Sequence, residues 1–169
     1  MDIISHGLWG SAVFGRKDKK SFWLAFLFGV APDLFSFGIF FATTFLGITP
    51  RPRFSAEPPD PALIPSYVSS LYNLTHSLII FLLVFGIIIF ATRKLRRPPW
   101  EMSAWGLHIL LDIPTHSYKF FPTPFLWPFS DFKIDGWHWG SGWIFFPNLA
   151  LLAILYLWFF ALKKRFSGT

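Results

Sequence analysis

The stretch WGLHILLDIPTHSYKFFP, residues 105–122, combines an apolar run with three side chains of metal-binding type. His108, Asp112 and His116 are spaced four residues apart, so on a helix they form a single stripe. Ionisable side chains are costly inside a bilayer, and they mark functional sites there. We therefore interpret this stretch as a membrane helix with one polar, ligand-bearing face.

The composition of the whole chain also indicates a membrane protein. Of its 169 residues, 53% are hydrophobic, including 23 Phe and 9 Trp. Only 14% are charged, whereas soluble domains have about 25%. The length suits one domain, so we expect residues 1–169 to form a single integral membrane domain. The absence of cysteine excludes disulfides and thiolate metal sites.

Four apolar runs are long enough to cross a bilayer, which requires about 20 residues. They lie at 22–47, 66–92, 99–118 and 141–162, and a shorter helix is expected at 3–15. The predicted fold is an all-α, polytopic membrane helix bundle of four transmembrane helices plus a short N-terminal helix. The segment MDIISHGLWG lacks a basic region and a cleavage site, so we expect mature protein there rather than a signal peptide.

Three basic clusters determine the expected orientation. RKDKK (16–20), RKLRR (93–97) and KKR (163–165) fall on one side of the four-span arrangement. The positive-inside rule makes that side cytoplasmic, so we expect a prokaryotic inner-membrane protein with cytoplasmic N- and C-termini. The net charge of +6 comes largely from these clusters, a pattern that favours membrane topology over nucleic-acid binding.

Three further ionisable residues, His6, Asp33 and His76, lie in apolar segments. A turn at 16–20 would set His6 beside Asp33, and a turn at 93–97 would set His76 opposite the 112–116 stretch. With a rise of about 1.5 Å per residue, all six residues then lie in one band near the middle of a core about 30 Å thick. We therefore expect them to form a metal site.

Other roles remain open for individual members of this set. A single histidine in a span is more often a helix–helix hydrogen-bonding residue than a ligand. Asp112 could orient a histidine rather than bind a metal. His138, in the aromatic segment GWHWG, is interpreted as an interfacial residue, and Asp131 and Asp135 as solvated loop charges.

Several short motifs resemble the YdjM-like family of membrane-bound metal-dependent hydrolases. They are His6 with Gly7, the APD of 31–33, the THS of 75–77, the H-x-x-x-D of 108–112 and Thr115, followed by the loop text PFLWPFSDFKIDG. The order His, Asp, His, H-x-x-x-D, His is more distantly similar to the superfamily of zinc-dependent phospholipases C and single-strand nucleases. Its later H-x-x-x-E pair has no counterpart here.

These resemblances imply a membrane-embedded hydrolase that acts on a phosphoester or other ester of a lipid-like substrate through a metal-activated water. Asp33 and Asp112 are the expected catalytic residues, with Asp33 as a bridge or water-orienting base. The implied ligands are His6, Asp33, His76, His108, Asp112 and His116. We expect one or two divalent ions, zinc first, with manganese or iron as alternatives.

The expected partners are the lipid bilayer and a membrane lipid or lipid-linked substrate. Two other functions are compatible with buried His and Asp residues. One is a metal-ion or proton-coupled transporter, because such residues also mark ion pathways. The other is a non-catalytic membrane protein in which the metal only holds the helices together.

Overall fold

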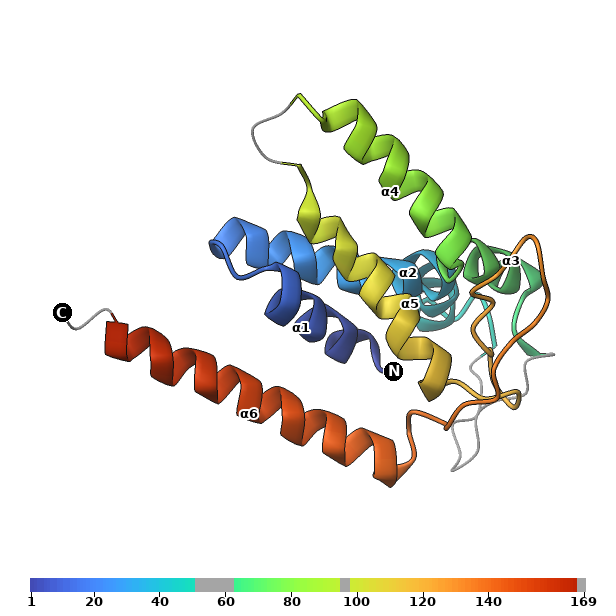
Figure 1. The fold of residues 1–169 in the computed structure, drawn as a ribbon. Coiled ribbons are helices and arrows are strands. Elements are labelled where there is room, and N and C mark those ends of the chain that lie inside the picture. The colour runs from blue at the N-terminus through green and yellow to red at the C-terminus, as the bar shows by residue number, and fades with distance from the viewer. Residues whose placement is uncertain (51–62, 95–97, 167–169) are drawn as a thin grey trace.

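In the computed structural model, residues 1–50, 63–94 and 98–166 are described, with side chains as far as Phe159. This part of the chain is helical and contains no strand, which confirms the predicted all-α class. In chain order the helices are α1 (Ile3–Phe14), α2 (Lys19–Phe45), α3 (Ser66–Thr75), α4 (Leu78–Thr92), the short 3₁₀ helix η2 (Trp100–Met102), α5 (Ser103–Thr115) and α6 (Gly142–Phe166). Figure 1 shows their arrangement.

The N-terminal hairpin forms as the basic turn predicts. Helix α1 ends at the cap residue Gly15, and α2 begins where Asp18 Oδ1 accepts a hydrogen bond of 2.7 Å from the Ser21 amide. Helix α1 contacts α2, α5 and α6, so it lies inside the bundle rather than at its edge (Figure 1). This central position brings His6 into the core.

Two helices are long and apolar enough to cross a membrane, which agrees with a membrane location. They are α2 (Lys19–Phe45) and the Gly142–Phe159 part of α6. Both overlap the predicted spans at 22–47 and 141–162. Most of the spanning part of α6 is exposed on the surface of the protein, as expected for a helix that faces lipid.

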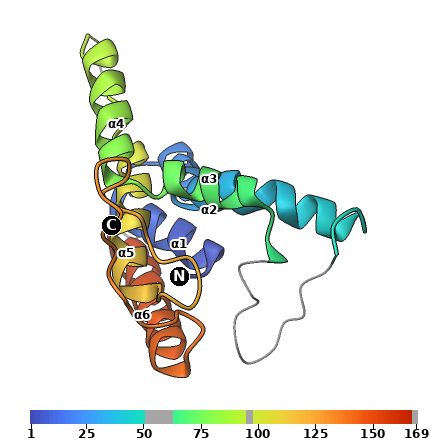
Figure 2. The same cartoon turned by 90° about the vertical axis from the view of Figure 1, so that its right-hand side faces the viewer.

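The predicted span at 66–92 is broken into two helices. Helices α3 and α4 meet at an angle of 55°, and the break lies at His76 and Ser77. Ser77 Oγ accepts a hydrogen bond from the Ile80 amide and so caps α4. Backbone freed inside a membrane needs partners, and the Phe125 carbonyl accepts from the Leu78 amide at 3.0 Å. Figure 2 shows α4 directed away from α3.

The predicted span at 99–118 is shorter than expected. Helix α5 has 13 residues, a length of about 20 Å, which is below the hydrocarbon thickness of about 30 Å. Pro98 and Pro99 lead into η2, and His116 leaves the helix with an extended backbone. The described helices thus supply two spans, or three if α3 and α4 act as one, and the predicted four spans are not confirmed.

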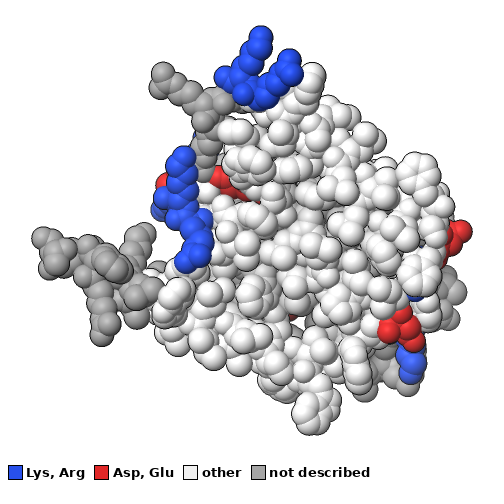
Figure 3. Space-filling model, in the orientation of Figure 1, with Lys and Arg blue, Asp and Glu red and all other residues white. Residues whose placement is uncertain are grey.

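The polarity of the bundle agrees with the basic clusters where side chains are described. Figure 3 shows most of the visible Lys and Arg at one end of the molecule, a broad uncharged surface in the middle, and a smaller group of basic and acidic side chains at the opposite end. The turn at 16–20 and the C-terminal end of α4 lie at the first end, and the loop that follows α5 lies at the opposite end (Figure 1). Residues 51–62 and 95–97, and the side chains of 163–165, fall outside the described part of the chain.

Candidate metal centre

Helix α5 contributes His108 and Asp112, which lie one turn apart and are buried. His108 Nε2 is 3.2 Å from Asp112 Oδ2. On the other side of the ring, His108 Nδ1 is 2.6 Å from the Gly29 carbonyl oxygen. A carbonyl only accepts, so Nδ1 carries the proton and Nε2 is left free to bind a metal, the arrangement typical of metal-binding histidines.

The break after α3 positions His76. Its ring stacks on Tyr72 with centroids 3.8 Å apart. His76 Nδ1 lies 2.9 Å from Thr75 Oγ1 and 3.2 Å from the Tyr72 carbonyl oxygen. These contacts direct Nε2 toward His108 Nε2, which is 3.0 Å away. The Trp105 indole donates to the Thr75 carbonyl at 2.7 Å and so ties the break to α5.

Helix α2 contributes Asp33 directly after Pro32. Its Oδ1 lies 3.4 Å from His76 Nε2 and 3.9 Å from His108 Nε2. The Asp33 side chain is 10% exposed, whereas those of His76, His108 and Asp112 are fully buried. Asp33 is therefore the member of the group that lies closest to the surface of the protein.

Four residues form a group that could hold a metal ion: Asp33, His76, His108 and Asp112, with ligand atoms within 4.8 Å of one another. Ligands about 2.0–2.1 Å from a tetrahedral zinc ion lie about 3.3 Å apart, and the His–Asp separations within this group range from 3.2 to 3.9 Å. Asp112 Oδ2 is buried and makes no hydrogen bond within the described residues. Two imidazoles and two carboxylates thus fit a divalent metal.

The other two predicted ligands, His6 and His116, contact the second oxygen of the same carboxylate. Asp112 Oδ1 lies 2.8 Å from His6 Nε2 and 3.3 Å from His116 Nδ1. The Met1 amino group is 2.5 Å from this oxygen. The short His6 contact is not aligned as a hydrogen bond, since His6 Nε2 has no hydrogen-bond partner within the described residues. All six predicted residues therefore gather around Asp112, but only four share one ligand group.

The loop after α5 determines where His116 lies. The Gly136 amide donates to the His116 carbonyl at 2.8 Å, and the Trp137 amide donates to the Pro114 carbonyl at 2.8 Å. A Cβ at position 136 would lie 2.6 Å from the His116 oxygen, so only glycine fits there. Thr75 and Gly136 belong to the short motifs at 75–77 and 124–136, although those motifs do not predict their contacts with the centre, and Gly29 belongs to no motif.

The loop histidine, His138, lies outside the group. It is half-buried, and this partial burial lowers the pKa of its imidazole below the ordinary value, with a smaller contribution from His116. Asp131 and Asp135 are exposed, and Asp135 Oδ1 accepts from the Tyr118 amide at 2.8 Å. The exposure of Asp131 and Asp135 agrees with their interpretation as solvated loop charges, and the interfacial position of His138 stays a prediction.

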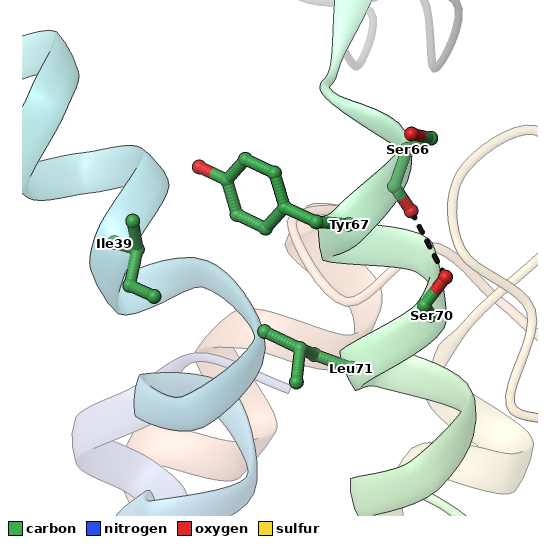
Figure 4. Close-up of a pocket in the computed structure, with 5 residues that line it drawn as sticks. All are labelled: Ile39, Ser66, Tyr67, Ser70 and Leu71. Carbon is green, nitrogen blue, oxygen red and sulfur yellow. Dashed lines mark hydrogen bonds between the residues drawn. The ribbon is translucent and has the colours of Figure 1, made fainter.

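A groove of about 620 Å³ lies between α2 and α3, the two helices that carry Asp33 and His76. It is lined by Ile39, Ser66, Tyr67, Ser70 and Leu71 (Figure 4). Ile39 follows Asp33 by six residues, which is about 9 Å along a helix. The groove therefore lies on the same two helices as Asp33 and His76 but includes none of the four residues of the metal group.

Comparison of the chain with protein-family models, with curated proteins and with solved structures finds no match in any of the three. The resemblance to membrane-bound metal-dependent hydrolases thus stays a prediction that rests on the short motifs.

Proposed function

We propose that this protein is a membrane-embedded, metal-dependent hydrolase. The observation that carries the proposal is the buried group of Asp33, His76, His108 and Asp112, gathered from three separate helical segments. Buried charges are costly unless they are paired or bind a metal. Because the ligands are nitrogen and oxygen without sulfur, zinc is the preferred ion, with manganese or iron as alternatives.

A divalent ion bound in such a group supplies a water of lowered pKa and polarises the scissile ester. The chain's own residues would then have distinct roles. His76 and His108 hold the ion through Nε2, because each Nδ1 is engaged by its own neighbours. Asp112 holds it through Oδ2. Asp33, the one partly exposed member, orients the attacking water and accepts its proton.

The two carboxylate oxygens of Asp112 face different histidines, so the centre could hold one ion or two. Oδ2 faces His76 and His108, and Oδ1 faces His6 and His116. One ion suits the first set. A second ion would be held by His6, His116 and Asp112 Oδ1, the oxygen that the Met1 amino group contacts here, and two ions would help to stabilise the attacking and leaving oxygens.

The proposed substrate is a phosphoester or other ester of a lipid. The group lies among apolar helices, and Asp33 belongs to a helix long enough to cross a membrane. The groove between α2 and α3 presents Ile39, Tyr67 and Leu71 beside two serines (Figure 4), a lining that suits an alkyl chain near a polar head. The partners are therefore the bilayer and a lipid or lipid-linked substrate.

The variant Asp33→Asn tests this function. It keeps the size and one oxygen ligand but removes the charge, so turnover should fall by about 10²-fold or more. The assay is hydrolysis of phospholipids and isoprenoid phosphates in detergent with zinc added. Asp131→Asn, in an exposed loop, is the matched control and should retain wild-type turnover.

The other outcomes would argue against the role of Asp33 or in favour of a different function. Turnover that Asp33→Asn retains in full would remove Asp33 from the mechanism. No hydrolysis of any ester, together with a melting temperature that a chelator lowers, would favour a metal that only joins the helices. Metal or proton flux in liposomes without hydrolysis would favour a transporter.

A further inference from the structure

A buried amide on α6 connects this helix to α1. Asn148 is 6% exposed on a helix that otherwise faces outward over most of its spanning part. An amide in such surroundings is costly unless both of its polar groups are hydrogen-bonded. Asn148 Oδ1 accepts from the Trp9 indole at 2.8 Å, and Nδ2 donates to Ser5 Oγ at 2.8 Å. Both partners belong to α1.

The contact with Ser5 continues into the cap of α1. Ser5 Oγ donates to Asp2 Oδ2 at 2.6 Å, and Asp2 Oδ1 accepts from the Ser5 amide at 2.9 Å. Asp2 is the N-cap residue of the helix. A continuous hydrogen-bonded path therefore leads from α6 to the first turn of α1, and His6 is the next residue in that turn.

His6 differs from the other histidines of the centre in how it is oriented. His76 and His108 each have Nδ1 in contact with an oxygen of a neighbouring residue. Within the described residues, neither ring nitrogen of His6 has a hydrogen-bond partner, although the residue is 1% exposed. Its ring stacks on His108 with centroids 3.7 Å apart. The direction of the His6 ring therefore depends on the position of the turn that carries it.

We propose that Asn148 is a positioning residue for the metal centre. Its two hydrogen bonds fix the first turn of α1, and this holds His6 Nε2 against Asp112 Oδ1. Asn148 contacts none of the six candidate ligands and acts through Ser5. The inference rests on the proposed metal-dependent function, because it assigns a role to His6 as part of the centre.

The test compares the full-length protein with Asn148→Leu, which removes both hydrogen bonds and leaves an apolar side chain at this buried position. Metal-stripped protein in detergent is titrated with Co²⁺, and the visible absorption and the affinity are measured. Asn148→Leu should weaken Co²⁺ binding by about 10-fold, as expected for loss of a supporting interaction. Its spectrum should shift toward that of His6→Ala, because the same nitrogen is lost.

Tyr156→Phe is the matched control. Tyr156 also joins α6 to α1, by donating to the Leu8 carbonyl at 2.8 Å, but this contact follows His6 in α1 and involves neither Ser5 nor Asp2. Tyr156→Phe should leave the Co²⁺ spectrum and affinity unchanged. Ser5→Ala is a smaller change on the same path and decides the matter if Asn148→Leu does not fold. Ser5→Ala should shift the Co²⁺ spectrum in the same direction as Asn148→Leu. In the double variant of Ser5→Ala and Asn148→Leu, the two losses of Co²⁺ affinity should not add up.

Wild-type spectra and affinities in both Asn148→Leu and Ser5→Ala would overturn this inference alone. An equal shift in Tyr156→Phe would also overturn it, because general loosening of α6 would then explain the effect. Failure of the wild-type protein to bind Co²⁺ would overturn the proposed function and this inference with it.

Discussion

The variant Gly29→Ala tests whether the close approach of α1 and α2 positions the metal centre. A Cβ at this position would lie 2.6 Å from the His6 carbonyl oxygen and 3.0 Å from the Gly7 Cα. The Gly29 carbonyl also accepts from His108 Nδ1 at 2.6 Å. One added methyl group therefore disturbs two histidines of the centre without altering any ligand.

The size of the effect follows from these distances. To restore an ordinary contact of 3.4 Å, α1 must retreat by about 0.8 Å, well beyond the tolerance of about 0.2 Å in a metal–ligand distance. We therefore expect metal affinity to fall by about 10–100-fold. Overpacking costs about 1–3 kcal/mol, which outweighs the about 0.5–1 kcal/mol that alanine contributes in a helix interior. The metal-free protein should therefore also unfold at lower temperature.

Gly38→Ala is the matched control for Gly29→Ala, because it makes the same change in the same helix where nothing lies within 4 Å of the added carbon. Zinc affinity is measured in detergent by competition with a chromophoric chelator, and stability by thermal unfolding. Wild-type zinc affinity in Gly29→Ala would refute the argument. An equal loss in Gly38→Ala would assign the effect to the helix rather than to the contact with His6.

Two further predictions concern topology and the loop. Reporter fusions at Lys17 and Arg96 should read cytoplasmic and fusions within 120–140 should read external, since basic clusters stay inside; an external signal at Arg96 would overturn the orientation. Gly136→Ala should lower the free energy of unfolding by about 1–3 kcal/mol, because its Cβ would collide with the Pro114 and His116 carbonyls. Gly86→Ala, with open space around it, should not lower the free energy of unfolding. Equal melting temperatures for the two variants would contradict the tight contact of Gly136 with the Pro114 and His116 carbonyls.

The fold could be predicted from the sequence where a local signal marks a boundary. The charged turn at 16–20 correctly predicts the α1–α2 hairpin, because Asp18 caps α2 there. The run at 66–92 offers no such signal: polar side chains such as Ser69 and Asn73 lie before the break, but their spacing also suits one continuous helix. Ser77 becomes a cap only because the distant loop supplies carbonyls from Phe125 and Trp127. The hydropathy of a segment cannot predict a hydrogen-bond partner that lies about fifty residues away in the sequence.

For the candidate site, the sequence predicts the ligand residues but not the groups that orient them. Residue type and spacing point to His108 and Asp112, and shared depth brings in Asp33 and His76, which the structure gathers into one group. The supporting groups could not be predicted, because the Gly29 carbonyl that orients His108 is a backbone atom and every residue has one. The stripe continues only to Asp112, since His116 lies past the end of α5 and reaches the carboxylate from an extended backbone.

Metal content of the purified protein tests the central claim most directly. Elemental analysis of the wild-type protein should find about one to two equivalents of a transition metal, given three or four ligands per zinc. The double variant His108→Ala, Asp112→Ala removes two of the four grouped ligands and should lose this metal. His138→Ala, outside the group, should retain it. Metal content that is unchanged in the double variant, or absent from the wild-type protein, would contradict the account.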